Sequence, residues 1–181
     1  IGKSTLAGLV AARLRSAFTD GVFEIAVAAL KQADQIYPAI ADAIGLKPIG
    51  ERPLPPQLFA HLAGKRMLLI LDNVEQLVEG AQHFTAVVDG APGVSILTTS
   101  RERLNLQDEV VFRLDGLPLP SNTGAEANES VALFLRHALR TNPGMARDER
   151  SFAAIARICR LVDGTPLALV LAASSAGALS L

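Results

Sequence analysis

The arrangement of apolar residues predicts a sheet built around one central strand. An unbroken run of five large apolar residues, Met67 to Leu71, stops at the acidic Asp72. Five residues are too few for a typical helix, and apolarity on both faces is typical of a strand inside a parallel sheet. Ligands of such sheets bind beyond the carboxyl ends of the strands, so Asp72 is placed to meet one. Shorter β-rich segments predict three further strands, at 22–27, 94–100 and 110–114.

The segments between these strands carry apolar residues at helical spacing. They predict helices at 4–18, 32–44, 58–64 and 75–89. Alternating strands and helices are typical of a doubly wound α/β sheet with helices on both faces. After the linker at 116–120 the pattern changes to helices alone, at 129–139, 148–162 and 166–179. We therefore predict an α/β domain over residues 1–120 and a small helical subdomain over residues 121–181, which we expect to be incomplete at its end.

The chain opens with part of a phosphate-binding motif. Gly2-Lys3-Ser4 matches the end of the loop G-x-x-x-x-G-K-[ST]. In that loop, backbone N–H groups and a helix N-terminus face the phosphates, the lysine neutralises phosphate oxygens, and the hydroxyl ligates Mg²⁺. Lys3 is therefore a candidate phosphate ligand, and Ser4 and Asp72 are candidate Mg²⁺ ligands. We expect a P-loop NTPase sheet whose first strand and loop start are missing from this sequence.

Composition narrows the possible functions. Half of the residues are hydrophobic and 19% are charged, which argues against disorder. The net charge of −1 provides no basic field for direct nucleic-acid or membrane binding. The single Cys159 excludes an internal disulfide and suits a reducing compartment, and no apolar run reaches the roughly 18 residues of a membrane span. We expect a cytoplasmic location.

The residues near Asp72 bear on hydrolysis. Asn73 stands where many hydrolysing phosphate-loop proteins place a second acid, and an amide cannot accept a proton. Hydrolysis is therefore expected to be slow, or to use Glu75, for which a plain acid at a helix start is an equal alternative. Arg101 ends the strand predicted at 94–100, where a guanidinium could sense or stabilise a γ-phosphate. The alternative for Arg101 is a side chain packed on the rim of the sheet.

Other functional classes find less support in the sequence. A small-molecule kinase would need a base and an acceptor pocket, for which no cluster of residues is present, and the Asn-Lys-x-Asp motif of GTPases is absent. His61, His83 and His137 are far apart without paired metal ligands, and no nucleophile elbow occurs. The serious rival is a nucleotide-independent scaffold with degenerate ATPase chemistry, which Asn73 favours.

Four motifs in this order resemble the STAND class of signalling ATPases, in the branch that contains NB-ARC or AP-ATPase domains. The similarity is strongest to LuxR-type and SARP-type bacterial transcriptional regulators, and it covers nearly the whole chain. It rests on a Walker A remnant, a Walker B strand, a sensor strand and a GxPLAL-like motif, found at Gly2–Thr5, Leu68–Glu75, Ile96–Arg101 and Gly164–Leu169.

The resemblance implies an ATP- or ADP-binding switch that hydrolyses ATP weakly. Lys3 would bind phosphates, Thr5 would lie near the α-phosphate, Arg101 would sense the γ-phosphate, and Pro166 would lie near adenine. For Gly164-Thr165-Pro166 an ordinary turn between helices is the alternative. Such proteins are described as opening, and oligomerising, when ATP replaces ADP. The partners implied are the nucleotide, other domains of the same parent protein and a second copy of it, with DNA binding in a domain outside these residues.

Overall fold

The computed structural model describes residues 2–121 and 128–175. The chain divides into two compact units, one over Lys3–Phe112 and one formed mainly by residues from Arg113 onward. The second unit includes the linker, because Leu117 N–H donates to the carbonyl of Gly164 (2.9 Å) and Arg160 Nη2 donates to that of Pro120 (3.1 Å). The boundary between the two units therefore lies at Arg113, before the linker and the helices that follow it.

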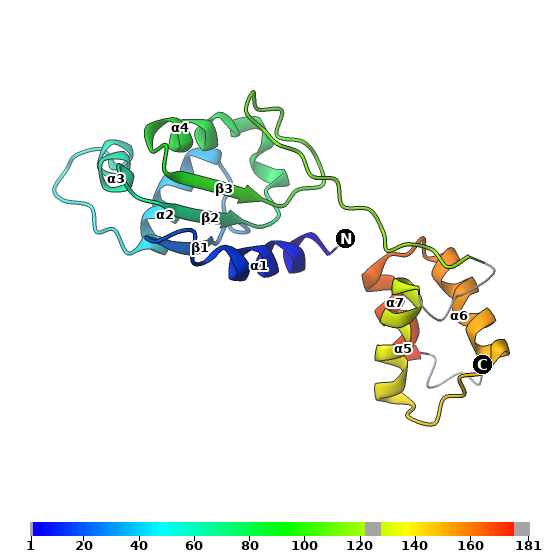
Figure 1. Ribbon diagram of the computed structural model, residues 1–181. Coiled ribbons are helices and arrows are strands. Elements are labelled where there is room, and N and C mark those ends of the chain that lie inside the picture. Colours follow the sequence, from blue (N-terminus) through cyan, green and yellow to red (C-terminus); the bar gives the residue numbers. More distant parts are fainter. Residues whose placement is uncertain (1, 122–127, 176–181) are drawn as a thin grey trace. The chain divides into compact units, whose positions relative to one another are not determined.

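The first unit is a mixed α/β structure, which confirms the predicted class (Figure 1). Its elements are α1 (Lys3–Leu14), β1 (Gly21–Ile25), η1 (Ala33–Gln35), α2 (Ile36–Ile44), α3 (Leu54–Leu62), β2 (Met67–Leu71), η2 (Glu75–Gly80), α4 (Gln82–Gly90) and β3 (Val94–Thr98). The three strands form a parallel sheet in the order β1-β2-β3, with Leu69 of β2 opposite Phe23 and Ile96. The apolar run is thus the central strand, as predicted.

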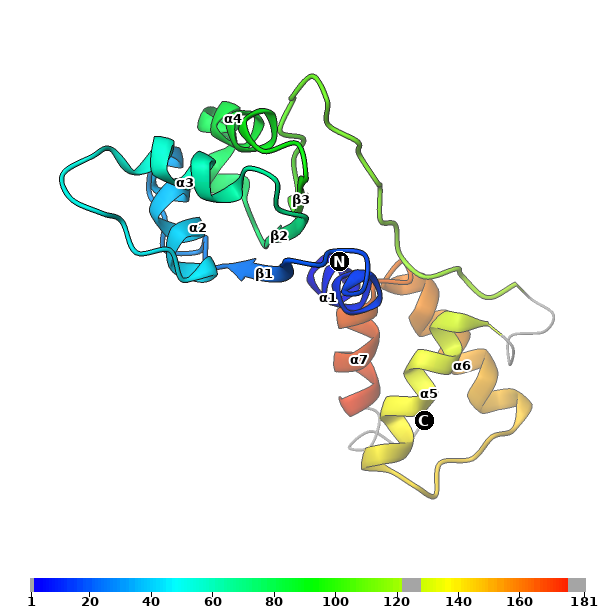
Figure 2. The same ribbon diagram turned by 60° about the vertical axis from the view of Figure 1, so that its left-hand side comes forward.

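Alternate residues of β2 serve two separate packing layers. Leu68 and Ile70 pack against Ala7 and Ala11 of α1 on one face. On the other face, Met67, Leu69 and Leu71 join the larger core, to which α2, α3, η2, α4, the two outer strands and the connecting loops also contribute buried residues. Figures 1 and 2 show α1 and α4 on opposite sides of the sheet. Burial on both faces is the physical reason why this strand has no polar position.

Several predictions about local structure were wrong. The helix predicted at 4–18 ends at Leu14, the one predicted at 32–44 consists of η1 and α2, and the one predicted at 58–64 begins at Leu54, because prolines are tolerated in the first turn of a helix. The segment 110–114 is not a strand, and Val110, Val111 and Phe112 are exposed. The region predicted as one helix at 75–89 consists of η2 and α4. A close contact accompanies the break, because a Cβ added at Gly80 would lie 2.1 Å from the Cβ of Ala33 in η1. Gly80 therefore lets η1 and η2 approach each other.

The second unit holds three helices, α5 (Glu129–Thr141), α6 (Glu149–Leu161) and α7 (Pro166–Ser175). Their starts follow capping rules: the Asn128 side chain accepts from the N–H groups of Ser130 and Val131, and that of Asp148 accepts from Ser151. One core joins buried residues of all three helices: Val131, Phe134, Ala138, Ile155, Cys159, Leu169 and Ala173. Residues 176–179 of the last predicted helix lie outside the described part of the chain.

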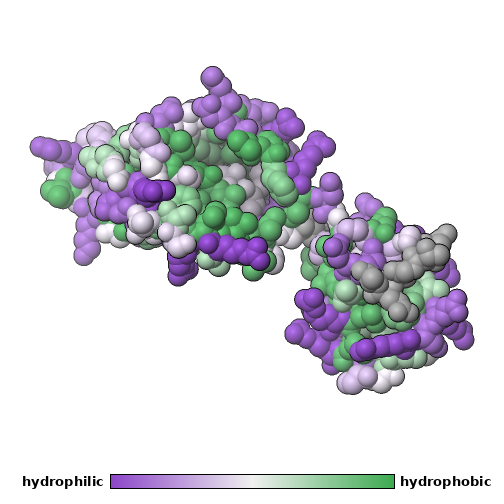
Figure 3. All heavy atoms as spheres, viewed as in Figure 1, coloured by the Kyte–Doolittle hydropathy of each residue, from purple (hydrophilic) through white to green (hydrophobic). Residues whose placement is uncertain are grey.

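Exposed apolar residues gather on one face of the first unit. Figure 3 shows apolar residues on the face turned to the viewer, with polar residues around them. Leu6, Leu9 and Leu14 of α1 are among the exposed large apolar residues. Among the described residues, no helix combines the length and apolarity that a membrane crossing requires.

Candidate functional site

Asp72 and Thr99 meet at the carboxyl edge of the sheet because each follows a parallel strand. Leu71 at the end of β2 lies opposite Thr98 at the end of β3, and Thr99 N–H donates to the carbonyl of Leu71 (2.9 Å). The Thr99 hydroxyl donates to Asp72 Oδ1 and accepts from the N–H of Asn73 (3.0 Å). Thr99 is only 6% exposed. A buried hydroxyl thus fixes one carboxylate oxygen of Asp72, and Oδ2 has no hydrogen-bond partner among the described residues.

The backbone at Asn73 explains why an amide follows Asp72. Asn73 has a φ of 64°, in the left-handed region where asparagine is one of the few tolerated non-glycine residues. Its side-chain amide fits with the nitrogen facing Glu75, 3.2 Å from Oε1 and 3.1 Å from Oε2. An aspartate at this position would instead set two carboxylates side by side. Asn73 therefore turns the chain and places an amide beside Glu75 without adding a second negative charge.

Glu75 and Arg101 form an ion pair beside Asp72. Arg101 Nε lies 2.6 Å from Glu75 Oε1, and the Glu75 side chain is 15% exposed whereas that of Arg101 is 77% exposed. Burial of the carboxyl group raises its pKa, but the hydrogen bond and charge of Arg101 outweigh burial and hold the pKa of Glu75 below its usual value. Glu75 is therefore ionised at neutral pH and already bound to two partners, which makes it a poor general base.

The phosphate-loop residues lie at the start of α1. Gly2 has a φ of 87°, Lys3 is the first helical residue, and Ser4 and Thr5 are exposed. Figure 1 shows the amino end of α1 on the side toward which the arrows of β2 and β3 point. In the described part of the chain, Lys3, Ser4 and Thr5 make no side-chain hydrogen bond or ion pair to Asp72 or Arg101. The structure thus brings Asp72, Glu75 and Arg101 into one cluster, and it leaves the loop residues beside the same sheet.

Pro166 belongs to the second unit, where it begins α7. The preceding Gly164 has a φ of 60°, and its N–H donates to the carbonyl of Cys159 (3.0 Å). This geometry suits a turn between helices, with proline at a position where its missing N–H costs nothing. The expected position of Pro166 near adenine stays a prediction.

The donors at the sheet edge suit Mg²⁺ better than a transition metal. Among the described residues, no group of three or more His, Cys, Asp or Glu side chains could hold a metal ion. Asp72 Oδ2 and the Ser4 hydroxyl are hard oxygen donors, and proteins often bind Mg²⁺ through one or two such groups plus phosphate and water. The donor chemistry of Asp72 and Ser4 is therefore of the kind that Mg²⁺ prefers.

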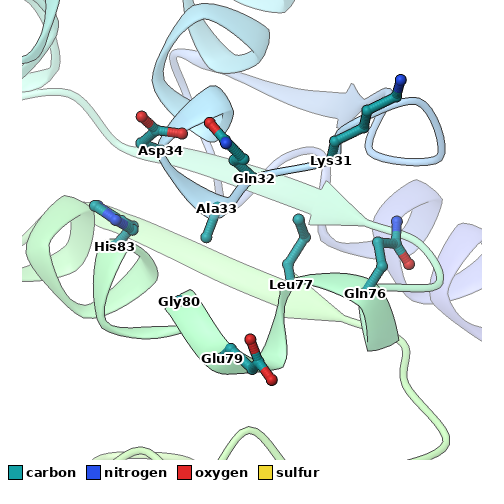
Figure 4. Close-up of a pocket in the computed structure, with 9 residues that line it drawn as sticks. All are labelled: Lys31, Gln32, Ala33, Asp34, Gln76, Leu77, Glu79, Gly80 and His83. Atoms are coloured by element: carbon teal, nitrogen blue, oxygen red, sulfur yellow. The ribbon is translucent and has the colours of Figure 1, made fainter.

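A polar pocket next to this edge was not predicted. It has a volume of about 500 Å³ and lies between η1 and η2 (Figure 4). Its lining consists of Lys31, Gln32, Ala33, Asp34, Gln76, Leu77, Glu79, Gly80 and His83. Nδ1 of His83 lies 2.9 Å from the hydroxyl of Tyr37, and Gln76 Nε2 donates to the carbonyl of Val27 (3.0 Å). The pocket carries charges of both signs, and η2, which starts at Glu75, connects it to the ion pair.

Sequence comparison relates the chain to bacterial regulators. No protein-family model matches it. A Mycobacterium tuberculosis protein named as a candidate HTH-type transcriptional regulator is 30% identical over 181 residues, which cover 99% of this chain and 20% of that protein. An uncharacterized protein of the same organism and its Mycobacterium bovis counterpart are 32% identical over 187 residues, covering 99% of this chain and 44% of each relative. The chain thus spans between a fifth and less than half of these relatives, and it is similar to one part of a protein named as a transcriptional regulator.

Proposed function

We propose that this chain is the ATP- and ADP-binding switch domain of a longer transcriptional regulator, with a P-loop NTPase fold and slow ATP hydrolysis. The observation that carries the proposal is the cluster at the carboxyl edge of β2 and β3. It presents an oriented carboxylate, Asp72, and an exposed guanidinium, Arg101, beside the helix that begins with Lys3-Ser4. The similarity to a protein named as a regulator supports the regulatory role.

Each residue has a physical role in this proposal. The start of α1 offers free backbone N–H groups and the positive end of a helix dipole to phosphates, and Lys3 adds a full charge. Asp72, held by Thr99, and Ser4 bind the Mg²⁺ of the nucleotide, which neutralises phosphate charge. Arg101 binds the terminal phosphate of ATP.

Slow turnover follows from the same geometry. The amide of Asn73 cannot take a proton from an attacking water, and the carboxylate of Glu75 is occupied by Arg101 and Asn73. A domain that holds its nucleotide for long periods suits signalling, because the bound nucleotide then records the state of the protein. The DNA-binding domain, the other domains of the regulator, oligomerisation and a cytoplasmic location belong to the proposal for the whole protein.

Calorimetric titration with ATP and ADP in the presence of Mg²⁺ tests nucleotide binding. The protein is a version of the chain that carries a complete G-x-x-x-x-G-K-S loop, so that all phosphate-facing N–H groups are present. Lys3→Ala is expected to lower the affinity for both nucleotides at least tenfold, since it removes the charge opposite the phosphates. Lys31→Ala, which changes an exposed lysine of the polar pocket, is the matched control and should bind as the unaltered protein does.

Two results would contradict the proposal. If neither nucleotide binds, the nucleotide-independent scaffold becomes the better description, as the replacement of the second acid by Asn73 already suggests. If Lys31→Ala rather than Lys3→Ala abolishes binding, the nucleotide site lies in the pocket of Figure 4. Phosphate release measured alongside separates slow turnover from fast hydrolysis.

A further inference from the structure

We propose that Glu75 is a positioning residue that presents the guanidinium of Arg101 to the terminal phosphate and so makes the site prefer ATP to ADP. This inference rests on the proposed nucleotide site and assigns Glu75 a role other than general base. The three groups that carry it are the Glu75 carboxylate, the Asn73 amide and the Arg101 guanidinium.

The contact with Glu75 uses Nε of Arg101 and leaves its two Nη groups available to a ligand. Glu75 binds Arg101 through Nε, at 2.6 Å, and in the described part of the chain neither Nη group makes a hydrogen bond. A guanidinium held at Nε can still offer both Nη groups as a fork to a phosphate, which is its strongest binding mode. Because the Arg101 side chain is largely exposed, this fork can reach a ligand at the sheet edge.

Glu75 is itself held in place. Its side chain is mostly buried, and it begins η2 shortly after β2 ends. With the Asn73 amide oriented so that its nitrogen faces Glu75, both carboxylate oxygens lie within 3.2 Å of that nitrogen. An exposed arginine is therefore tied to a mostly buried carboxylate. Such support reduces the conformational entropy that the Arg101 side chain loses when it binds phosphate.

The preference for ATP follows from where Arg101 acts. A guanidinium that meets only the γ-phosphate contributes nothing to ADP binding, so removing Glu75 should change the affinity for ATP alone. Two other roles predict different results. A carboxylate that competes with phosphate for Arg101 would lower the affinity for ATP, and a general base would act on hydrolysis without acting on binding.

Nucleotide affinities of single and double variants test the inference, in the complete-loop version of the chain with Mg²⁺. The probes are ADP and a non-hydrolysable ATP analogue. Glu75→Ala and Arg101→Ala are each expected to lower the affinity for the analogue at least fivefold. Each should change the affinity for ADP by no more than twofold. The double variant should bind the analogue no more weakly than Arg101→Ala alone, since Glu75 acts through Arg101. Glu75→Gln, which retains an oxygen acceptor for Nε, should restore part of the preference.

The control is Glu79→Ala, which removes an exposed carboxylate from the same η2 segment and should leave both affinities unchanged. An unchanged ADP affinity in Glu75→Ala shows that the site remains folded. Tighter binding of the analogue by Glu75→Ala, or additive losses in the double variant, would overturn the positioning role. The positioning role would also be overturned if Glu75→Ala bound the analogue with unchanged affinity but lost phosphate release. Failure of the unaltered protein to bind either nucleotide would overturn the proposed function, and this inference with it.

Discussion

Gly164→Ala is expected to destabilise the helical unit by about 2–5 kcal/mol. Two costs add at this position. Gly164 has a φ of 60°, which disfavours any residue with a Cβ, and an added Cβ would lie 2.1 Å from the carbonyl oxygen of Leu117. That oxygen belongs to the backbone, which is tied to the same place because Leu117 N–H donates to the carbonyl of Gly164 (2.9 Å). The clash cannot be relieved by a side-chain rotation.

Gly45→Ala separates the two costs. Gly45 ends α2 with a φ of 73°, and a Cβ added there would meet no atom within 4 Å. Its replacement should therefore cost only the conformational term, about 1–2 kcal/mol. Urea unfolding monitored by circular dichroism measures both variants. Equal decreases in the free energy of unfolding for the two variants would show that the close contact with Leu117 does not contribute to the effect of Gly164→Ala.

Phe134→Ala is expected to reduce the stability of the helical unit by about 3–5 kcal/mol. The Phe134 side chain is 0% exposed and belongs to the core shared by α5, α6 and α7. Removing the ring forfeits its transfer free energy and leaves a cavity that the surrounding helices fill only in part. Small helical units have little stability in reserve, so much of this unit should unfold at a lower denaturant concentration.

Leu161→Ala is the matched control for Phe134→Ala. Leu161 ends α6 but is 82% exposed, so its truncation should change stability by no more than about 0.5 kcal/mol. The cores of the two units share no residue among those described. Fluorescence probes placed separately in each unit should therefore show the loss in the helices and not in the sheet. A loss of similar size at Leu161 would contradict the described core.

The parts of the fold that depend on local pattern were predictable. Met67–Leu71 was predictable as a central strand because a strand covered on both faces must be apolar at every position. The segment 110–114 has the same β-rich composition, yet Val110 is 95% exposed and no strand of the described sheet pairs with the segment. Strand formation needs a neighbour, and composition does not reveal whether one exists. The break before α4 depends on a distant contact between Gly80 and Ala33, which no local pattern carries.

The placement of the candidate site residues at one edge of the sheet was predictable, but the hydrogen bonds between them were not. Asp72 and Arg101 were found because polar residues that follow apolar strands collect at one edge of a parallel sheet. The role of Thr99 depends on the register of β2 against β3, which brings its hydroxyl to Asp72. The conformation of Asn73 and its approach to Glu75 also depend on the folded turn. These connections explain why the asparagine, which the sequence shows only as a missing acid, suits its position.

Mapping of amide chemical shifts by NMR during a titration with Mg²⁺ and ADP tests the central claim most directly. The claim is that nucleotide binds at the carboxyl edge of the sheet, so the measurement uses the complete-loop version of the chain. The largest shift changes are expected at residues 2–6, 72–75 and 99–101. Saturable changes confined to residues 31–34 and 76–83 would place the ligand in the polar pocket, and the absence of any saturable change would contradict nucleotide binding altogether.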